Sequence, residues 1–313
     1  PARDRDSALP PEGGIFFYME VTGLIMTVLI RALADALGEN AIGGDYGTLC
    51  HHNAYGTRPD GTPWAASAVA GGETGPWGAS KAGDADGHSC QYLLNFMAPP
   101  SELLELGFPV MILRREYAPD TGGIGLNRGG PGVLKDVMWT DDASHETTPL
   151  RFRKQPGVGV AGGRDGANGG VWIFGQEGRP GSGEEIFVST EAEVYADAVA
   201  VAGTLDPLTN VPDPAGEYAY FCSTPVWPTG PGAMWRYLTN AGGGWGDPLG
   251  RDPERVKTDV RDGYVSIEAA ERDFGVVVSG DPHRYPERLE IDFAATAARR
   301  SQMADEKTEK DGD

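Results

Sequence analysis

The chain has 313 residues, of which 46 are acidic and 26 are lysine or arginine, for a formal net charge of −20. This length is enough for a large core and for one to three domains. The acidic surplus excludes binding along a phosphate backbone, which relies on clustered cationic side chains, so no nucleic acid partner is expected.

The cysteines and the apolar runs indicate the cellular compartment in which the protein is expected. Cys50, Cys90 and Cys222 are widely spaced and form no C-x-x-C pair, so they predict neither a disulfide framework nor a thiolate zinc site. A cytoplasmic, reducing setting is expected, and the start of the sequence predicts no signal peptide. The most apolar run, residues 21–30, is too short to span a bilayer, so no membrane association is expected.

The first predicted element is a helix over residues 22–39. Its leucine, isoleucine, valine and methionine side chains cover more than one face, and Gly38 lies near its end. A helix that is apolar on most sides is expected to be buried in a core or an interface. We therefore assign it a structural role.

The middle of the chain reads as β-rich. Residues 40–100 alternate glycine clusters with polar loops, and a short helical step is predicted at 99–105. Short apolar runs between turn residues then predict strands, whereas residues 191–202 fit either a helix or a strand. The predicted strands are 108–116, 133–140, 150–153, 171–174, 185–189 and 218–222.

Two compact helices are predicted after residue 242. Asp252 can cap the first, with Pro253 at its first position and Gly263 at its stop. Ser266 can cap the second, which ends near Gly275. A short strand at 276–278 and a final helix at 294–310 follow.

These elements predict an α+β fold: a β-rich core with long glycine-rich loops, one buried N-terminal helix and short C-terminal helices. We divide the sequence into three parts. Residues 1–140 form a glycine-rich α/β part, 141–240 a β-rich part, and 241–313 a C-terminal helical segment with a charged tail.

The most informative stretch is E-Y-A-P-D-T-G-G-I-G-L-N-R-G-G-P-G at 116–132. Its six glycines lie between two predicted strands, so they form a shaped connection and not a flexible linker. In one interpretation Arg128 pairs with Asp120 or Glu116 inside a tight β-connection. In the other the loop is functional, and its candidate substrate-binding residues are Glu116, Asp120, Gly122 and Gly123.

Two histidine-containing clusters are further candidates. Asp84, Asp86 and His88 alternate, so an extended segment would place them on one face as an acid/base or cation-binding cluster, unless Asp-Gly is simply a turn. His51 and His52 could supply one metal ligand, but their spacing matches no named site and favours a hydrogen-bonded structural pair. No metal ligand is therefore assigned to this chain.

Three tryptophans between residues 227 and 245 allow two interpretations of their role. Trp227, Trp235 and Trp245 could line a substrate pocket, although packing in a core or interface is the commoner use. Trp245 is retained as a substrate-binding candidate. The sequence contains no Walker loop, G-x-S-x-G elbow, H-E-x-x-H motif or strand-linked G-x-G-x-x-G, so this chain is not expected to bind a nucleotide.

Several motifs, taken in order, resemble the hydantoinase B/oxoprolinase family. They are P-x-E-x-x-E at 100–105, D-x-G-G-x-G-x-x-R-G-G-x-G at 120–132, G-G-G-W-G-D-P-L-x-R-D-P-E-R-V at 242–256, D-G-Y-V-S-I-E-A-A at 262–270 and F-G-V-V at 274–277. The resemblance covers most of the chain, is weakest over 141–215, and corresponds only to the second half of the longer chain typical of this family.

The resemblance implies partners and cofactors. The family includes B subunits of ATP-dependent hydantoinases, the C-terminal half of 5-oxoprolinase and the large subunits of acetone and acetophenone carboxylases. It implies an actin-like, hydantoinase A-like ATPase that holds ATP and Mg and phosphorylates the carbonyl or enolate oxygen of the substrate. It also implies a first-half hydantoinase B-like subunit, which would carry any divalent metal, Zn or Mn.

Three functional hypotheses follow from the resemblance. In the first, a small cyclic amide or imide such as a hydantoin or lactam is opened by water after phosphate activation. Its candidate catalytic residues are Asp86, His88 and Arg128, with glycine N–H groups facing the developing oxyanion. In the second, an enol phosphate is carboxylated, as in the ketone carboxylases. In the third, the chain is a non-catalytic scaffold.

Overall fold

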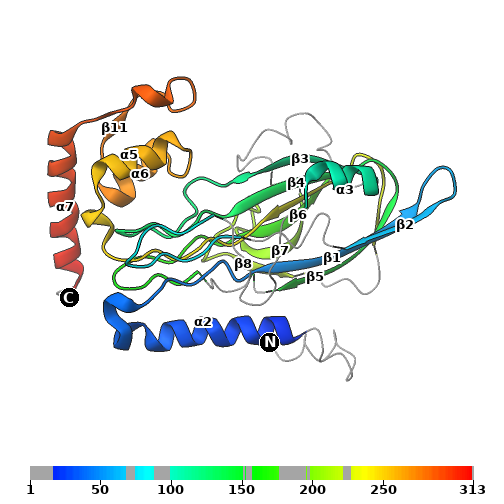
Figure 1. Ribbon diagram of the computed structural model, residues 1–313, viewed down its shortest axis with the longest axis horizontal. Helices are drawn as coiled ribbons and strands as arrows, with labels where there is room; N and C mark the ends of the chain where they lie inside the picture. Colours follow the sequence, from blue (N-terminus) through cyan, green and yellow to red (C-terminus); the bar gives the residue numbers. More distant parts are fainter. Residues whose placement is uncertain are drawn as a thin grey trace.

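The computed structural model describes residues 17–67, 75–87, 99–150, 152, 157–175, 195, 198–220 and 227–311. Helices and antiparallel sheets occupy separate regions of the molecule, which confirms the predicted α+β class (Figure 1). The sheets form the centre, and the C-terminal helices lie beyond one end of them.

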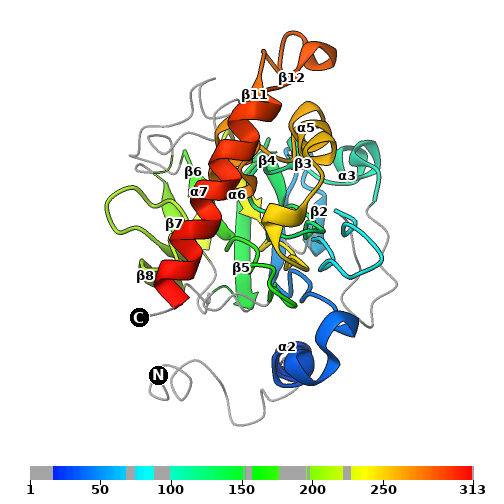
Figure 2. The same cartoon turned by 90° about the vertical axis from the view of Figure 1, so that its left-hand side faces the viewer.

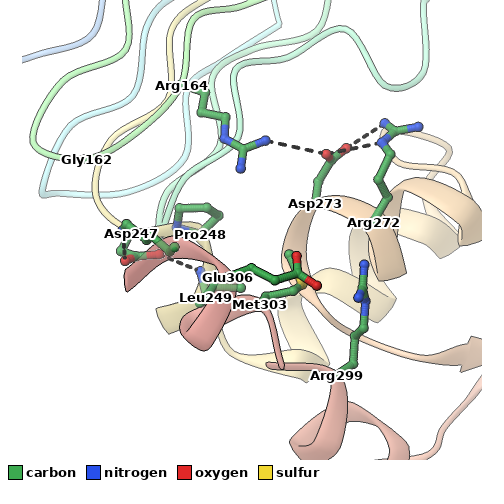
Figure 3. A pocket seen from close by; sticks show the side chains of 11 residues that line it. Gly162, Arg164, Asp247, Pro248, Leu249, Arg272, Asp273, Arg299, Met303 and Glu306 are labelled. Carbon is green, nitrogen blue, oxygen red and sulfur yellow. Dashed lines mark hydrogen bonds and ion pairs between the residues drawn. The ribbon is translucent and has the colours of Figure 1, made fainter. Parts of the chain in front are cut away.

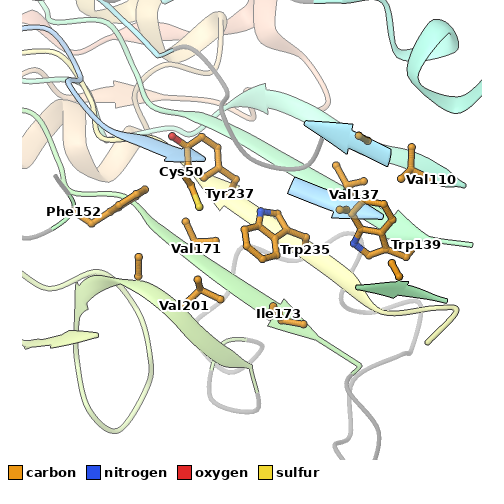
Figure 4. Packing of buried hydrophobic residues seen from close by; sticks show 14 of the residues in the cluster. Cys50, Val110, Val137, Trp139, Phe152, Val171, Ile173, Val201, Trp235 and Tyr237 are labelled. Atoms are coloured by element: carbon orange, nitrogen blue, oxygen red, sulfur yellow. The ribbon is translucent and has the colours of Figure 1, made fainter. Parts of the chain in front are cut away.

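Two antiparallel sheets face each other across the main core. The larger has the strand order β3 (Val110–Tyr117), β4 (Val133–Trp139), β10 (Met234–Leu238), β6 (Gly170–Phe174), β7 (Val199–Leu205) and β8 (Glu217–Tyr220). The smaller has the order β2 (Pro63–Ser67), β1 (Leu49–Thr57), β5 (Ala143–Leu150) and β9 (Trp227–Thr229). Side chains of both sheets, among them Cys50, Trp139 and Trp235, fill the space between them (Figure 4).

The central strands of the larger sheet are buried on both faces. Every residue of β6 and β10 is buried, and their second face packs in another apolar cluster that contains Trp172, Met234 and Leu238. By contrast, β2 alternates exposed and buried residues, as expected for a strand with one face in water. The larger sheet therefore forms the middle of the molecule.

Both sheets join residues from the two sides of position 140. Strand β5 pairs with β1, with Thr147 opposite His52, and β10 pairs with β4, with Trp235 opposite Val137. Strands from the predicted parts 1–140 and 141–240 therefore pair within the same sheets. The boundary between these two parts marks a change in composition.

Extended glycine-rich segments connect the sheets to the C-terminal helices (Figure 1). We call them the glycine bundle; its segments are 41–48, 75–87, 118–132, 157–169 and 239–247. They bind one another laterally through backbone hydrogen bonds. Gly243 lies between two of them, since its N–H donates to Gly44 O at 2.9 Å and its carbonyl accepts from Ala79 N–H at 2.8 Å.

The bundle leaves no room for side chains at its centre. A Cβ atom on Gly242 would lie 1.9 Å from the carbonyl oxygen of Trp77, and one on Gly243 would lie 1.9 Å from that of Val158. Because the opposing atoms are backbone, no rotamer change can relieve the clash. Gly242 and Gly243 are therefore required because neighbouring segments of the same chain approach them closely.

The C-terminal helices have the predicted caps. In α5 (Pro253–Arg261) the Asp252 carboxylate accepts the N–H of Glu254 at 2.9 Å, and in α6 (Ile267–Phe274) the Ser266 hydroxyl accepts that of Ala269 at 3.0 Å. Gly275 ends α6 at a φ of 63°. The final helix, α7 (Phe293–Asp311), runs across this end of the molecule (Figure 2).

The remaining elements are short. They are α3 (Ser101–Gly107), the strands β11 (Val278–Ser279) and β12 (Glu290–Ile291), and the 3-10 turns Gly38–Asn40, Pro248–Gly250 and Pro286–Arg288. The strand predicted at 150–153 lies earlier, as β5. Within residues 191–202, β7 begins at Val199, while the strand predicted at 185–189 lies outside the described residues.

The N-terminal helix was predicted to be buried, and this prediction is wrong within this chain, because residues 25–37 of the helix do not pack in its core. The helix, α2 (Phe17–Leu37), lies beside the glycine bundle. Over residues 25–37 it is largely exposed; Ile25, Val28 and Leu33 are 52%, 61% and 47% exposed. Its apolar pattern matched a core helix because a sequence cannot distinguish a core from an interface. Among the described residues, no helix is both long and apolar enough to cross a membrane.

The close contacts of the bundle predict that Gly242→Ala destabilises the fold. We expect a loss of about 3 kcal/mol or more in the free energy of unfolding, because the clash can be relieved only by backbone movement. Gly107→Ala is the matched control, since a Cβ there meets nothing within 4 Å. Urea denaturation of both variants measures the difference, and equal stabilities would contradict the prediction.

Candidate functional site

The structure brings two of the predicted catalytic residues onto neighbouring segments of the glycine bundle. The N–H of Ala85 donates to Arg128 O at 2.9 Å, and the N–H of Trp77 donates to Asp86 O at 3.0 Å. Asp86 is exposed at the edge of the bundle. The third predicted catalytic residue, His88, lies outside the described residues.

Arg128 is buried and engaged in interactions within the chain. Its Nε lies 3.3 Å from Asp259 Oδ1, its Nη1 donates to Gly129 O at 2.9 Å, and its guanidinium lies 4.4 Å from the ring centroid of Tyr264. Its carboxylate partner comes from α5, 131 residues away in sequence. The guanidinium thus ties the bundle to the C-terminal helices.

The predicted pairing of Arg128 with Asp120 or Glu116 is wrong. Glu116 lies on β3 and pairs with Arg114 at 3.1 Å. The carboxylate of Asp120 accepts the N–H of Ser266 at 2.7 Å, directly before α6. Both acidic groups have nearer partners, whereas the carboxylate that faces Arg128 belongs to a distant helix.

Gly122 and Gly123 lie inside the bundle. A Cβ on Gly122 would lie 2.5 Å from Gly129 O, and the N–H of Gly123 donates to Gly242 O at 2.8 Å. The N–H of Gly123 is therefore already used and cannot face an oxyanion. Both residues shape the loop through their small size.

A partly buried ion network lies beside Arg128, centred on the buried Arg251. Arg251 is 1% exposed and binds Asp84 in bidentate fashion at 2.7 and 2.9 Å. It also contacts Asp259 at 2.7 Å. Arg255 completes the network by pairing with Asp84 at 2.9 Å. The network links the 75–87 and 118–132 segments to α5.

The network determines the protonation of Asp84. Burial alone would raise the pKa of its carboxyl, but the hydrogen bonds and charge of Arg251, with further bonds from Arg128 N–H and Arg255, lower that pKa to about 2. Asp84 is thus a carboxylate at neutral pH and is not suited to proton transfer. Of the alternating Asp84, Asp86 and His88, the structure assigns Asp84 to the ion network.

Trp245 lies where three bundle segments meet. Its backbone forms bridges with Asn127 and Val160, and its indole Nε1 is buried without a hydrogen-bond partner among the described residues. The next residues, from Asp247 onward, border a cleft of about 340 Å³ between the bundle, α6 and α7 (Figure 3). None of the predicted site residues lines this cleft.

His52 forms a buried pair with His145, a residue that the sequence analysis did not name. His52 stacks on Trp235 with ring centroids 4.3 Å apart, and its Nε2 shares a hydrogen bond of 2.9 Å with Nδ1 of His145. His145 Nε2 lies 2.7 Å from the Thr229 hydroxyl. The structural reading is confirmed for His52, and no group of three metal-binding side chains occurs among the described residues.

Sequence reasoning missed the residues at the centre of the network, Arg251, Arg255 and Asp259. Arg251 and Arg255 lie in the motif at 242–256, so the signal was present but carried no indication of their partners. Asp259 lies between the buried Val256 and Val260 of α5. A carboxylate on the buried side of a helix was the available sign of an ion pair.

The ion network predicts a strong dependence of stability on Arg251. Arg251→Met leaves Asp84 and Asp259 without their main counter-charge, so we expect a loss of about 3–5 kcal/mol in the free energy of unfolding. Lys257→Met is the control, because it breaks only the surface pair with Glu254 and should cost less than about 1 kcal/mol. Equal losses in urea denaturation would refute the assignment.

The histidine pair predicts acid sensitivity. Burial lowers the pKa of His145 to about 3 and that of His52, which lies near His145 and Lys135, well below 6.5. The unfolded chain takes up protons near pH 6.5 while the folded chain does not, so stability falls as pH decreases from about 6.5 toward 3. Each imidazole contributes a slope of up to about 1.4 kcal/mol per pH unit.

The pH slope separates this effect from simple loss of packing. His145→Gln should reduce the dependence of unfolding free energy on pH between about pH 6 and pH 5, above the range of most carboxylates. The exposed His283 provides the control for removing an imidazole from the surface, by His283→Gln. An unchanged slope in His145→Gln would show that His145 is protonated in the folded state.

Known proteins that resemble this chain include relatives that are much longer. The sequence matches the hydantoinase B/oxoprolinase family over residues 7–248. The caprolactamase beta subunit of Pseudomonas jessenii is 29% identical over 208 residues, 66% of this chain and 28% of that protein. The putative D-/L-hydantoinase B subunit of Pseudomonas sp. strain NS671 is 26% identical over 199 residues, 63% of this chain and 26% of that protein.

Two solved structures with a similar fold are also longer than this chain. Nucleotide-free acetone carboxylase aligns with a TM-score of 0.64 and 20% identity, over 90% of this chain and 37% of that chain. The ATP-dependent caprolactamase of Pseudomonas jessenii aligns with a TM-score of 0.61 and 25% identity, over 87% of this chain and 40% of that chain. This chain spans only 26% to 28% of the two curated relatives above. Because the family match covers more than half of its 313 residues, the chain belongs to the hydantoinase B/oxoprolinase family.

Proposed function

We propose that this chain is one subunit of an ATP-dependent multi-subunit enzyme that hydrolyses a cyclic amide or imide, such as a lactam or hydantoin. It corresponds to the second half of a hydantoinase B-like chain and acts on a carbonyl activated by phosphate. The observation that carries the proposal is the 29% identity over 208 residues to a caprolactamase beta subunit.

The hydrolase reading has more support than carboxylation. The likeness to acetone carboxylase, at 20% identity, supports a shared fold. Caprolactamase is similar both in sequence and, at 25% identity, in structure. A ketone carboxylase subunit is the alternative, and a non-catalytic scaffold is the second alternative.

The proposal includes two protein partners. A first-half hydantoinase B-like subunit would carry any divalent metal, Zn or Mn. A hydantoinase A-like ATPase would hold ATP and Mg. The exposed Ile25, Val28 and Leu29 of α2 support an apolar contact with such a partner, because an unpaired helix of this kind leaves much apolar surface in water.

Within the complex, Asp86 is the candidate for proton transfer from this chain. Its side chain is exposed at the edge of a rigid bundle, and its backbone is held by Trp77. Arg128, being bound to Asp259, would act by positioning this edge. Asp120, Gly122, Gly123 and Trp245 would shape the surface that faces the substrate, while the roles of His88 and Glu116 stay predictions.

Turnover by the assembled complex tests the reaction. Substrate-dependent ATP hydrolysis is measured with lactam, hydantoin and ketone substrates, with and without bicarbonate. We expect ring opening of a cyclic amide with no need for bicarbonate. Incorporation of labelled carbon from bicarbonate would instead identify a carboxylase.

Substitution of Asp86 tests whether this chain takes part in the chemistry. Asp86→Asn should lower kcat about 100-fold with the complex intact, as expected when a proton-transfer group is lost. Asp60→Asn, on the exposed β1–β2 turn, is the matched control and should change kcat little. A change of only a few-fold in Asp86→Asn would favour the scaffold alternative.

A further inference from the structure

The cleft between the glycine bundle and the C-terminal helices has an unusual charge arrangement. It is bordered by Arg164 from the bundle, Arg272 from the end of α6, and a face of α7 that contains Arg299 and Glu306 (Figure 3). Its volume of about 340 Å³ is that of a small-molecule site. It lies just beyond Trp245, in the segment that forms the centre of the bundle.

The carboxylates of the cleft are already occupied. Asp273 binds Arg272 Nη2 at 2.6 Å, and Asp247 binds Lys307 Nζ at 2.8 Å. Glu306 accepts a hydrogen bond from Gln302 at 2.9 Å. These contacts neutralise two of the four cationic side chains that line the cleft.

The other two cations, Arg299 and Arg164, are less fully paired. Arg299 makes no hydrogen bond or ion pair with any described residue, and its Nε is buried. Arg164, whose side chain is 62% exposed, lies 3.8 Å from Asp273, shares that carboxylate with Arg272, and also acts electrostatically on Asp247. Four cations against three acids leave the cleft with a net positive charge inside a chain of net charge −20.

Arg299 is partly exposed, but its Nε–H is a buried donor without an acceptor, and such a donor normally has a partner because leaving it unpaired is costly. The planar fork of a guanidinium matches the two oxygens of a carboxylate or the oxygens of a phosphate. We propose that this cleft binds a small oxyanion, a phosphate or carboxylate group, through Arg299 and Arg164. The proposal depends on these side chains and on no particular reaction of the complex.

Calorimetric titration of the full chain tests the proposal, with sodium phosphate and sodium acetate as probes at constant ionic strength and pH 7. We expect wild-type binding with a Kd of roughly 1 mM. Arg299→Gln and Arg164→Gln should each weaken binding about 10-fold, the usual value of a charge-assisted hydrogen bond. Tighter binding of phosphate would identify a phosphoryl site, and tighter binding of acetate a carboxylate site.

A variant of opposite sign separates binding from damage to the fold. Glu306→Gln removes an acidic charge from the cleft and should tighten binding about 3-fold, while the exposed Arg284→Gln should leave it unchanged. Circular dichroism verifies that each variant is folded. The proposal would be overturned if neither anion bound the wild-type protein at roughly 50 mM, about 50 times the expected Kd. It would also be overturned if neither Arg299→Gln nor Glu306→Gln changed the affinity.

Discussion

The structure depends on the approach of backbone to backbone in the glycine bundle. At Gly242 and Gly243 the neighbouring carbonyl oxygens occupy the space where a Cβ would lie, so the segments can hydrogen-bond laterally only if side chains are absent. This contact fixes the distance between the sheets and the C-terminal helices. Side chains such as Asp86 and Arg128 project from segments whose positions are set by these contacts.

The ion network acts on the same junction by a different mechanism. A buried charge is costly to desolvate, and an ion pair offsets that cost only when its geometry is well defined. The bundle provides the geometry by holding Asp84 opposite Arg251, and α5 places Asp259 against both Arg251 and Arg128. Packing of the backbone and pairing of the charges therefore support each other.

Local signals were sufficient for some of this structure. The caps at Asp252 and Ser266 and the left-handed Gly275 depend on residues within a single turn, and the sequence identified each of them. The partners of Arg128 and His52 could not be found in this way, because Asp259 and His145 are 131 and 93 residues distant. Which acid of the 84–88 cluster enters the ion network was likewise decided by the position of Arg251.

The exposed helix α2 shows a further limit of sequence patterns. Its apolar residues have the periodicity of a packed helix, yet Val28, Leu29 and Leu33 are exposed on this chain. The ion pair of Arg31 with Asp165, at 3.6 Å between exposed side chains, adds little stability. The apolar pattern therefore indicates that the helix can pack against another surface, but it does not indicate which one.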